Sequence, residues 1–245
     1  MIPKVIHYCW FGRNPLPASA LKCIESWKRY LPGYEIVEWN EDNFDVREIP
    51  YVAQAYDAGK YAFVSDYARF KVLNSYGGLY FDTDVEVVAP MDDILECGPY
   101  MGMEKTLSGD IAVNPGLGFA AEPGMEVLEK LLETYSRLQF RNADGSLNQT
   151  TIVKHTTDML LQYGYIHEDK LQQCAGFQIY PVEYFCPLDY RTGTLAKTSN
   201  TRTIHHYAST WHTWKDKWIR LKRVFFSEDQ IRKISAFLDK FRKRA

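Results

Sequence analysis

The sequence contains few cysteines and no long apolar run, and both absences narrow the classes of protein it can encode. Its five cysteines are an odd number without a CxxC spacing, which argues against a disulfide framework and a cysteine-rich zinc site. No run of 18 apolar residues is present, so no segment is predicted to span a membrane. The first residues, MIPKVIHYCWFG, lack the apolar core and the cleavage site of a signal peptide. We therefore expect a cytoplasmic protein.

Internal repeats and low-complexity linkers are also missing from the sequence. A chain of 245 residues is long enough for one α/β domain with a sizeable core. We therefore predict a single catalytic domain over residues 1–213, followed by a helical tail over residues 214–245.

Positive charge is concentrated in that tail. Residues 214–245 hold 11 Lys and Arg against 4 Asp and Glu, which leaves 18 against 27 for the rest of the chain. Large apolar side chains recur there at helical spacing among the basic residues, namely Trp214, Trp218, Leu221 and Phe225. Such a helix can lie peripherally on an anionic membrane surface, or it can dock on the body with its basic face in water. Nucleic-acid binding is not expected, because the basic charge is confined to the tail and no recognition motif accompanies it.

Predicted strands and helices alternate along the first half of the chain. Residues 4–11, 35–40 and 79–88 have the composition of strands, whereas residues 18–31 and 60–78 have helical spacing. Gly77 or Gly78 is expected to end the second helix. Further on, residues 110–123 predict two strands around a turn, residues 124–140 and 156–164 predict helices, and residues 177–188 predict short strands. This alternation indicates an α/β fold with helices covering a sheet.

Two carboxylates stand one residue apart in the segment YGGLYFDTDVEVVAP. Strand periodicity would put Tyr80, Asp82, Asp84 and Glu86 on one face of a continuous strand. A pair of oxygen ligands at the end of a strand suits Mn²⁺ or Mg²⁺ shared with a diphosphate. The alternative is an acidic stripe on an edge strand, since a bare DxD pattern is common by chance.

The preceding helix carries Asp66 and Arg69, three residues apart and hence on one face. Alone, this spacing is that of a surface ion pair. Beside a DxD pattern, an arginine able to neutralise phosphate and an aspartate able to bind hydroxyls indicate a second part of a site.

Three blocks of sequence, IPKVIHYCWFG, SDYARFKVLNSYGGLYFDTDVEVV and IHHYASTW, together resemble the DxD-containing glycosyltransferase family 32. This family includes initiating α-mannosyltransferases and capsular polysaccharide transferases, and it is distantly similar to the glucosyltransferase domains of clostridial toxins. The blocks span residues 1–211 and leave out the tail. The resemblance implies a Rossmann-like GT-A fold, a nucleotide-sugar donor held through Mn²⁺ or Mg²⁺, and retention of configuration at the transferred sugar.

The resemblance also implies roles for individual residues. Asp84 would be the direct metal ligand, with Asp82 supporting the metal and contacting the donor. Asp66 would bind hydroxyls of the sugar, and Arg69 would bind the sugar or the phosphate. Trp10 would stack on the nucleobase, and Tyr80 would pack against the nucleoside unless it is simply a buried core residue.

The last block implies further donor contacts. His206 stands three residues before Ser209 and five before Trp211, the spacing at which the family has a metal-linked group, so His206 is the expected metal-linked residue. Neighbouring strand residues point to opposite faces, so only one of His205 and His206 can face the metal. Ser209 and Trp211 would contact the diphosphate, and Asn114 would line the sugar pocket. Glu104 and Asp110 have no assignable role.

The expected activity is transfer of a hexose from a UDP-sugar, or a GDP-sugar, to a glycan or lipid-linked acceptor in bacterial polysaccharide synthesis. One alternative is a sugar- or nucleotide-binding protein without turnover on the same scaffold. Another is a metal-dependent phosphohydrolase of the haloacid dehalogenase type, whose motif is also DxD. That motif requires Thr or Val where this chain has Glu86, and it leaves Asp66 and Arg69 without a role.

Overall fold

The computed structural model describes residues 1–106, 108–190 and 192–208 and contains a mixed sheet of eight strands. The strands of the described chain are β1 (Val5–Cys9), β2 (Glu35–Trp39), β3 (Gly78–Tyr80), β4 (Val85–Val87), β5 (Tyr100–Lys105), β6 (Ile111–Val113), β7 (Phe119–Ala121), β8 (Gln172–Cys174), β9 (Phe177–Tyr180), β10 (Leu188–Asp189), β11 (Thr194–Leu195) and β12 (Thr203–His205). The helices are α1 (Ala18–Tyr30), α2 (Pro50–Asp57), α3 (Tyr61–Tyr76), α4 (Asp92–Glu96), α5 (Glu126–Ser136), α6 (Ile152–Leu161), α7 (Val182–Phe185) and the 3₁₀ turn η1 (Pro115–Leu117).

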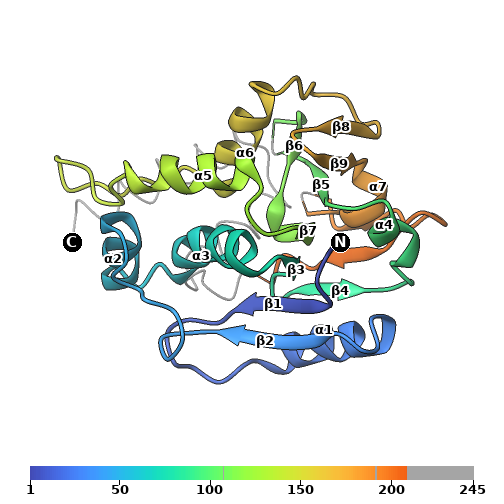
Figure 1. Ribbon diagram of the computed structural model, residues 1–245, viewed down its shortest axis with the longest axis horizontal. Coiled ribbons are helices and arrows are strands. Elements are labelled where there is room, and N and C mark those ends of the chain that lie inside the picture. Colours follow the sequence, from blue (N-terminus) through green and yellow to red (C-terminus); the bar gives the residue numbers. More distant parts are fainter. Residues whose placement is uncertain (107, 191, 209–245) are drawn as a thin grey trace, which may run out of the picture.

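The main sheet has the order β2-β1-β3-β7-β5-β9-β8, which runs from bottom to top in Figure 1, with β6 paired to β5. Strand β1 is parallel to both β2 and β3, whereas β7 runs antiparallel between β3 and β5. The parallel part therefore brings the carboxyl ends of β1, β2 and β3 to one edge of the sheet.

Helices cover both faces of this sheet. Helices α2, α3 and α5 lie in the left half of Figure 1, and α1, α4 and α7 lie in the right half. Each group has its own apolar core: Phe70 and Tyr135 are buried in the first, and Trp27 and Phe185 in the second. This arrangement confirms the predicted α/β class.

Most of the elements predicted in the first half of the chain are present. Strands β1 and β2 and helices α1 and α3 lie within the predicted segments. Gly77 is the C-cap of α3 with a φ of 64°, and Gly78 follows with a φ of 99°. A Cβ on Gly78 would lie 2.6 Å from the carbonyl oxygen of Val5, so a glycine is required where α3 turns into the sheet.

The predicted continuous strand over residues 79–88 is wrong. Strand β3 ends at Tyr80 and β4 begins at Val85, because the chain leaves the main sheet between them. The amide of Phe81 still donates to His7 of β1, but the amide of Val85 donates to the carbonyl of Asp82 and closes a turn. Strand β4 then pairs antiparallel with β12 in a separate two-stranded sheet. The indole of Trp27 fixes the new direction by donating to the Val85 carbonyl at 2.7 Å.

The second half of the chain follows the predictions less closely. Strands β6 and β7 around η1, and helix α5, lie in the predicted segments, whereas α6 begins at Ile152, four residues before the predicted helix, and ends at Leu161. Within residues 177–188, β9 is a strand as expected, but Val182–Phe185 forms the short helix α7. The tail over residues 214–245 lies outside the described residues. Within the described chain, no helix combines the length and the apolar character needed to cross a bilayer.

Candidate metal centre

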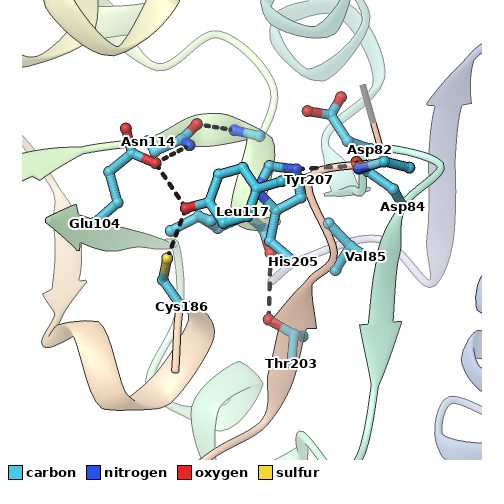
Figure 2. A network of polar contacts seen from close by, with 12 residues as sticks. Asp82, Asp84, Val85, Glu104, Asn114, Leu117, Cys186, Thr203, His205 and Tyr207 are labelled. Atoms are coloured by element: carbon cyan, nitrogen blue, oxygen red, sulfur yellow. Dashed lines mark hydrogen bonds and ion pairs between the residues drawn. The ribbon is translucent and has the colours of Figure 1, made fainter. Parts of the chain in front are cut away.

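The turn between β3 and β4 brings Asp82 and Asp84 together with a histidine from the far end of the described chain. Strand β12 pairs antiparallel with β4, so that His205 lies opposite Val85. One ligand atom from each of Asp82, Asp84 and His205 lies within 4.8 Å of the other two. Figure 2 shows the His205 ring directed at Asp84, with Asp82 beside it.

Asp84 is held as a carboxylate from two sides. Nε2 of His205 lies 3.1 Å from its Oδ1, and the amide of Ala208 donates to its Oδ2 at 2.8 Å. Burial alone would raise the pKa of Asp84, but His205 and the Ala208 amide lower it to about 2. Conversely, burial opposes the charge on His205, yet the neighbouring Asp84 raises the pKa of the imidazole. This site therefore presents an ionised oxygen ligand at neutral pH.

Asp82 is tied to α3 through Arg69. The Arg69 guanidinium donates to Asp82 at 3.2 Å and lies 3.0 Å from Oδ1 of Asp66. Beneath it, the Tyr80 ring is 4.8 Å from the guanidinium carbon, and the Tyr80 hydroxyl donates to Asp82 at 3.0 Å. The pair Asp66 and Arg69 is thus buried and part of the site, and is not a surface ion pair.

Two carboxylates, Asp66 and Asp82, share the single guanidinium of Arg69. Burial raises the pKa of Asp66 to about 7, with Arg69 acting in the opposite direction. Burial also raises the pKa of Asp82, again opposed by Arg69. Burial disfavours the charge on Arg69, but Asp82 and the other acidic neighbours outweigh it and raise the pKa of the guanidinium. Arg69 therefore stays charged, while its partners ionise less readily than free carboxylates.

The turn η1 closes the site on a third side. A Cβ on Gly116 would lie 2.5 Å from Oδ2 of Asp82 and 3.2 Å from Nη1 of Arg69, so only glycine lets the backbone approach this closely. The Gly116 amide donates to Oδ1 of Asn114 at 2.7 Å, and the Asn114 side chain donates to Glu104 at 2.7 Å. Asn114 is therefore buried near Asp82, and its side chain contacts η1 and β5.

The histidine beside the aspartates is His205, whereas the sequence led us to expect His206. The side chain of His206 points the other way and lies 2.8 Å from Glu86, with 43% of it exposed. Strand alternation alone does not decide between the two residues, because His205 pairs with Val85 and Asp84 lies in the turn before β4, where its carboxylate comes within 3.1 Å of the His205 ring.

Of the other residues predicted to bind the donor, one is buried, one is partly exposed and two lie outside the described residues. Tyr80 is 1% exposed beneath Arg69, so its ring supports Asp82 and has no face open to a nucleoside. Trp10 follows β1 at the carboxyl edge of the sheet, is partly exposed, and donates to the carbonyl of Asn14 at 2.6 Å. Ser209 and Trp211 lie outside the described residues.

Three residues that sequence reasoning did not assign also belong to the site: Glu104, Gly116 and Tyr207. Gly116 stands two residues after Asn114, and Tyr207 lies in the block IHHYASTW, so both are close to residues that were assigned. Glu104 was noted as a nearby carboxylate only. No local pattern marks them, since each acts through contacts to segments distant in the sequence.

The side chains present fit a divalent cation. Carboxylates are the ligands that Mg²⁺ and Mn²⁺ prefer, and an imidazole is a common ligand of transition metals, so the three side chains can hold a divalent cation without selecting a particular ion. Nε2 of His205 lies 3.1 Å from Asp84, and Nδ1 is buried without a hydrogen-bond partner among the described residues, so one nitrogen of the ring is unused. Which of its two nitrogens faces a cation depends on the tautomer.

Comparison with known proteins agrees with this geometry. Residues 17–99 match the family model described as a glycosyltransferase sugar-binding region containing a DXD motif. An inositol phosphoceramide mannosyltransferase of Schizosaccharomyces pombe is 30% identical over 123 residues, which are 49% of this chain and 33% of that protein. An uncharacterized glycosyltransferase of Acanthamoeba polyphaga mimivirus is 31% identical over 108 residues, which are 40% of this chain and 41% of that protein. The chain thus spans well under half the length of these curated relatives.

The fold also has a counterpart among solved structures. The PaToxG glycosyltransferase superposes with a TM-score of 0.50 at 18% identity, covering 66% of this chain and 69% of that one. At this identity the likeness concerns the fold alone, and it confirms the predicted GT-A architecture. The DXD region over residues 17–99, the GT-A fold and the paired aspartates of the turn after β3 thus agree with one another, and the chain resembles DXD-containing glycosyltransferases in both sequence and fold.

Proposed function

We propose that this protein transfers a hexose from a nucleotide sugar to a glycan or lipid-linked acceptor, with Mn²⁺ or Mg²⁺ held by Asp82, Asp84 and His205. The observation that carries the proposal is the convergence of these three side chains at the carboxyl edge of β3, next to the buried Arg69. Open α/β sheets bind their ligands at this edge.

Some residues of the site would bind the cation, and others hold those residues in position. A bound divalent cation would neutralise charge on the leaving diphosphate. Asp84, ionised well below neutral pH, would hold that cation, with His205 and Asp82 completing the protein's ligands. Arg69 fixes Asp82 and Asp66 in place, and Asp66, the second carboxylate on this guanidinium, would bind donor hydroxyls. Trp10 would stack on the base, and Ser209 and Trp211 would contact the diphosphate.

The finer details of the reaction rest on resemblance. UDP is the preferred nucleotide and GDP the alternative, with retention at the anomeric carbon. The mannosyltransferase names of two relatives put a mannosyl donor on the panel to be tested. A role in bacterial polysaccharide synthesis, in the cytoplasm, is part of the same proposal.

The basic tail would bring the enzyme to the inner face of the membrane, where a lipid-linked acceptor resides. This part of the proposal is supported by the positive charge of residues 214–245 and by the large apolar residues that recur there at helical spacing. Full-length protein should sediment with vesicles containing anionic lipid, and Lys215, Lys217, Lys222 and Arg223 changed together to Glu should abolish this. Equal sedimentation of both proteins would reject the membrane role.

Donor turnover tests the activity directly. We expect Mn²⁺-dependent release of UDP or GDP from one member of a panel of nucleotide hexoses, accelerated by a glycan acceptor and lost in Asp84→Asn. Binding of the nucleotide without release in either condition would favour the silent binding protein. Release of phosphate from a phosphomonoester, without use of any nucleotide sugar, would favour the phosphohydrolase.

A further inference from the structure

Glu104 is a buried carboxylate outside the group of three candidate ligands. It is hydrogen-bonded both to a residue that positions the turn beside Asp82 and to a residue next to the contacts of Asp84. Glu104 lies near the end of β5 and is 9% exposed. Its Oε2 accepts a hydrogen bond from the Asn114 side chain at 2.7 Å and another from the Tyr207 hydroxyl at 3.2 Å. One oxygen therefore receives two donors, one from Asn114 and one from Tyr207, as Figure 2 shows.

The first of these contacts leads to Asp82. Oδ1 of Asn114 accepts the amide of Gly116 at 2.7 Å, which fixes η1. The Cα of Gly116 lies against Asp82, where even one added carbon would come within 2.5 Å of Oδ2. Any shift of Asn114 would therefore be passed to the turn that confines Asp82.

The second contact leads to Asp84. Tyr207 stands between His205 and Ala208, which both contact the Asp84 carboxylate. Its φ is 49°, a conformation that is unfavourable for a non-glycine residue and that persists only when its surroundings hold it. The ring centroid is 4.1 Å from that of His205, and the hydroxyl also lies 2.9 Å from Sγ of Cys186. Since the hydroxyl proton goes to Glu104, the Cys186 thiol is left to donate to the phenolic oxygen.

We propose that Glu104 and Tyr207 are a positioning pair that holds His205 and the Ala208 amide on Asp84 and, through Asn114, holds η1 on Asp82. The inference rests on the proposed function, because the site that is positioned is the proposed metal and donor site. Neither residue belongs to the group of three candidate ligands, so both act through others. Partners of metal ligands commonly tune affinity in this way.

The test compares the affinity of full-length variants for Mn²⁺ alone, measured from the electron paramagnetic resonance signal of the free ion. Tyr207→Phe keeps the ring and removes only the hydroxyl, and Glu104→Leu removes the acceptor. We expect each to weaken Mn²⁺ binding about tenfold or more. Glu104→Gln keeps an oxygen acceptor for both donors and should bind nearly as tightly as the wild-type protein.

Tyr8→Phe is the matched control. It deletes a hydroxyl that donates to the carboxylate of Glu38 at 2.6 Å, between β1 and β2 and away from the metal centre. Mn²⁺ affinity should be unchanged in this variant. If Tyr207→Phe and Glu104→Leu also bind Mn²⁺ like Tyr8→Phe, the positioning pair is rejected.

Amide hydrogen exchange, measured without metal, tests the positioning pair independently of the proposed metal site. Tyr207→Phe should speed exchange in the segment that contains the Ala208 amide, whereas Tyr8→Phe should not. Failure of the wild-type protein to bind Mn²⁺ would reject the metal site, and the exchange of this segment would then decide the positioning pair by itself. Unchanged exchange in Tyr207→Phe would overturn the pair.

Discussion

Nε2 of His205 lies 3.1 Å from Oδ1 of Asp84, although 121 positions separate the two residues in the chain. This contact exists because the short strands β4 and β12 pair antiparallel outside the main sheet. It turns the DxD motif, which alone is a weak pattern, into a site with three candidate ligands.

His205 and His206 should therefore behave differently on substitution. His205→Ala should weaken Mn²⁺-dependent nucleotide binding at least about tenfold, the loss that removal of a ligand's partner already causes. His206→Ala removes only the half-exposed pair with Glu86 and should leave the affinity near the wild-type value. Calorimetric titration of both variants checks this, and a larger loss in His206→Ala would reverse the assignment.

Gly116→Ala tests the close approach of η1 to the site. The added methyl group would displace Asp82 or Arg69, so we expect Mn²⁺-dependent nucleotide affinity to fall about tenfold. Overpacking should cost about 1–3 kcal/mol of unfolding free energy. A double-mutant cycle with Asp82→Ala provides the control, because the stability cost of Gly116→Ala should shrink once the crowded carboxylate is gone. Full additivity would show that the strain lies elsewhere.

Arg69 should be indispensable for stability as well as for the site. Arg69→Met leaves Asp66 and Asp82 buried without their cation, which should lower the unfolding free energy by about 3–5 kcal/mol. Adding Asp66→Asn removes one of the two stranded carboxylates and should restore part of the loss. Urea unfolding of the single and double variants measures this, and an unchanged midpoint in Arg69→Met would contradict it.

His7 should make the fold sensitive to acid. The Trp39 indole donates to its Nδ1 at 3.0 Å and Nε2 lies 3.0 Å from the Gly77 carbonyl, so the neutral ring with a proton on Nε2 satisfies both contacts. Burial lowers the pKa of His7 from 6.5 to about 4. Because the folded protein disfavours protonation, its contribution is complete above about pH 6.5 and is lost as the pH falls toward 4, by about 1.4 kcal/mol per unit.

The comparison with His7→Gln isolates this residue from the other titrating groups. The wild-type unfolding free energy should fall more steeply than that of His7→Gln between pH 6.5 and 4. Parallel curves in denaturant titrations over this range would show that His7 is not the sensitive group.

The long, strongly patterned elements could be predicted from the sequence. Helix α3 has a glycine end and carries Asp66 and Arg69 at a spacing that fixes their common face, and the resemblance supplied their expected roles. Helix α2 went unpredicted although Pro50 stands at its first position, a usual start signal. The acidic first turn of α4 was a similar signal.

The errors within the site have a different cause. The segment over residues 79–88 is rich in strand-forming residues, and its two aspartates, which are a turn signal as well, were interpreted as ligands on the face of a continuous strand. The turn forms because Trp27 and β12 draw β4 out of the main sheet. Choosing between His205 and His206 requires the conformation of the turn that contains Asp84 as well as the pairing of two strands only three residues long, and neither is marked in the local sequence. Glu104, Gly116 and Tyr207 were unassigned for the same reason.

The most direct test of the metal and donor site is calorimetric titration of the full-length protein with UDP and with GDP, each with and without Mn²⁺. One nucleotide should bind only when Mn²⁺ is present, and Asp84→Asn should abolish that binding while leaving the thermal unfolding cooperative. If neither nucleotide binds the wild-type protein with Mn²⁺, or if Asp84→Asn binds as tightly, the convergence of Asp82, Asp84 and His205 is not a donor site.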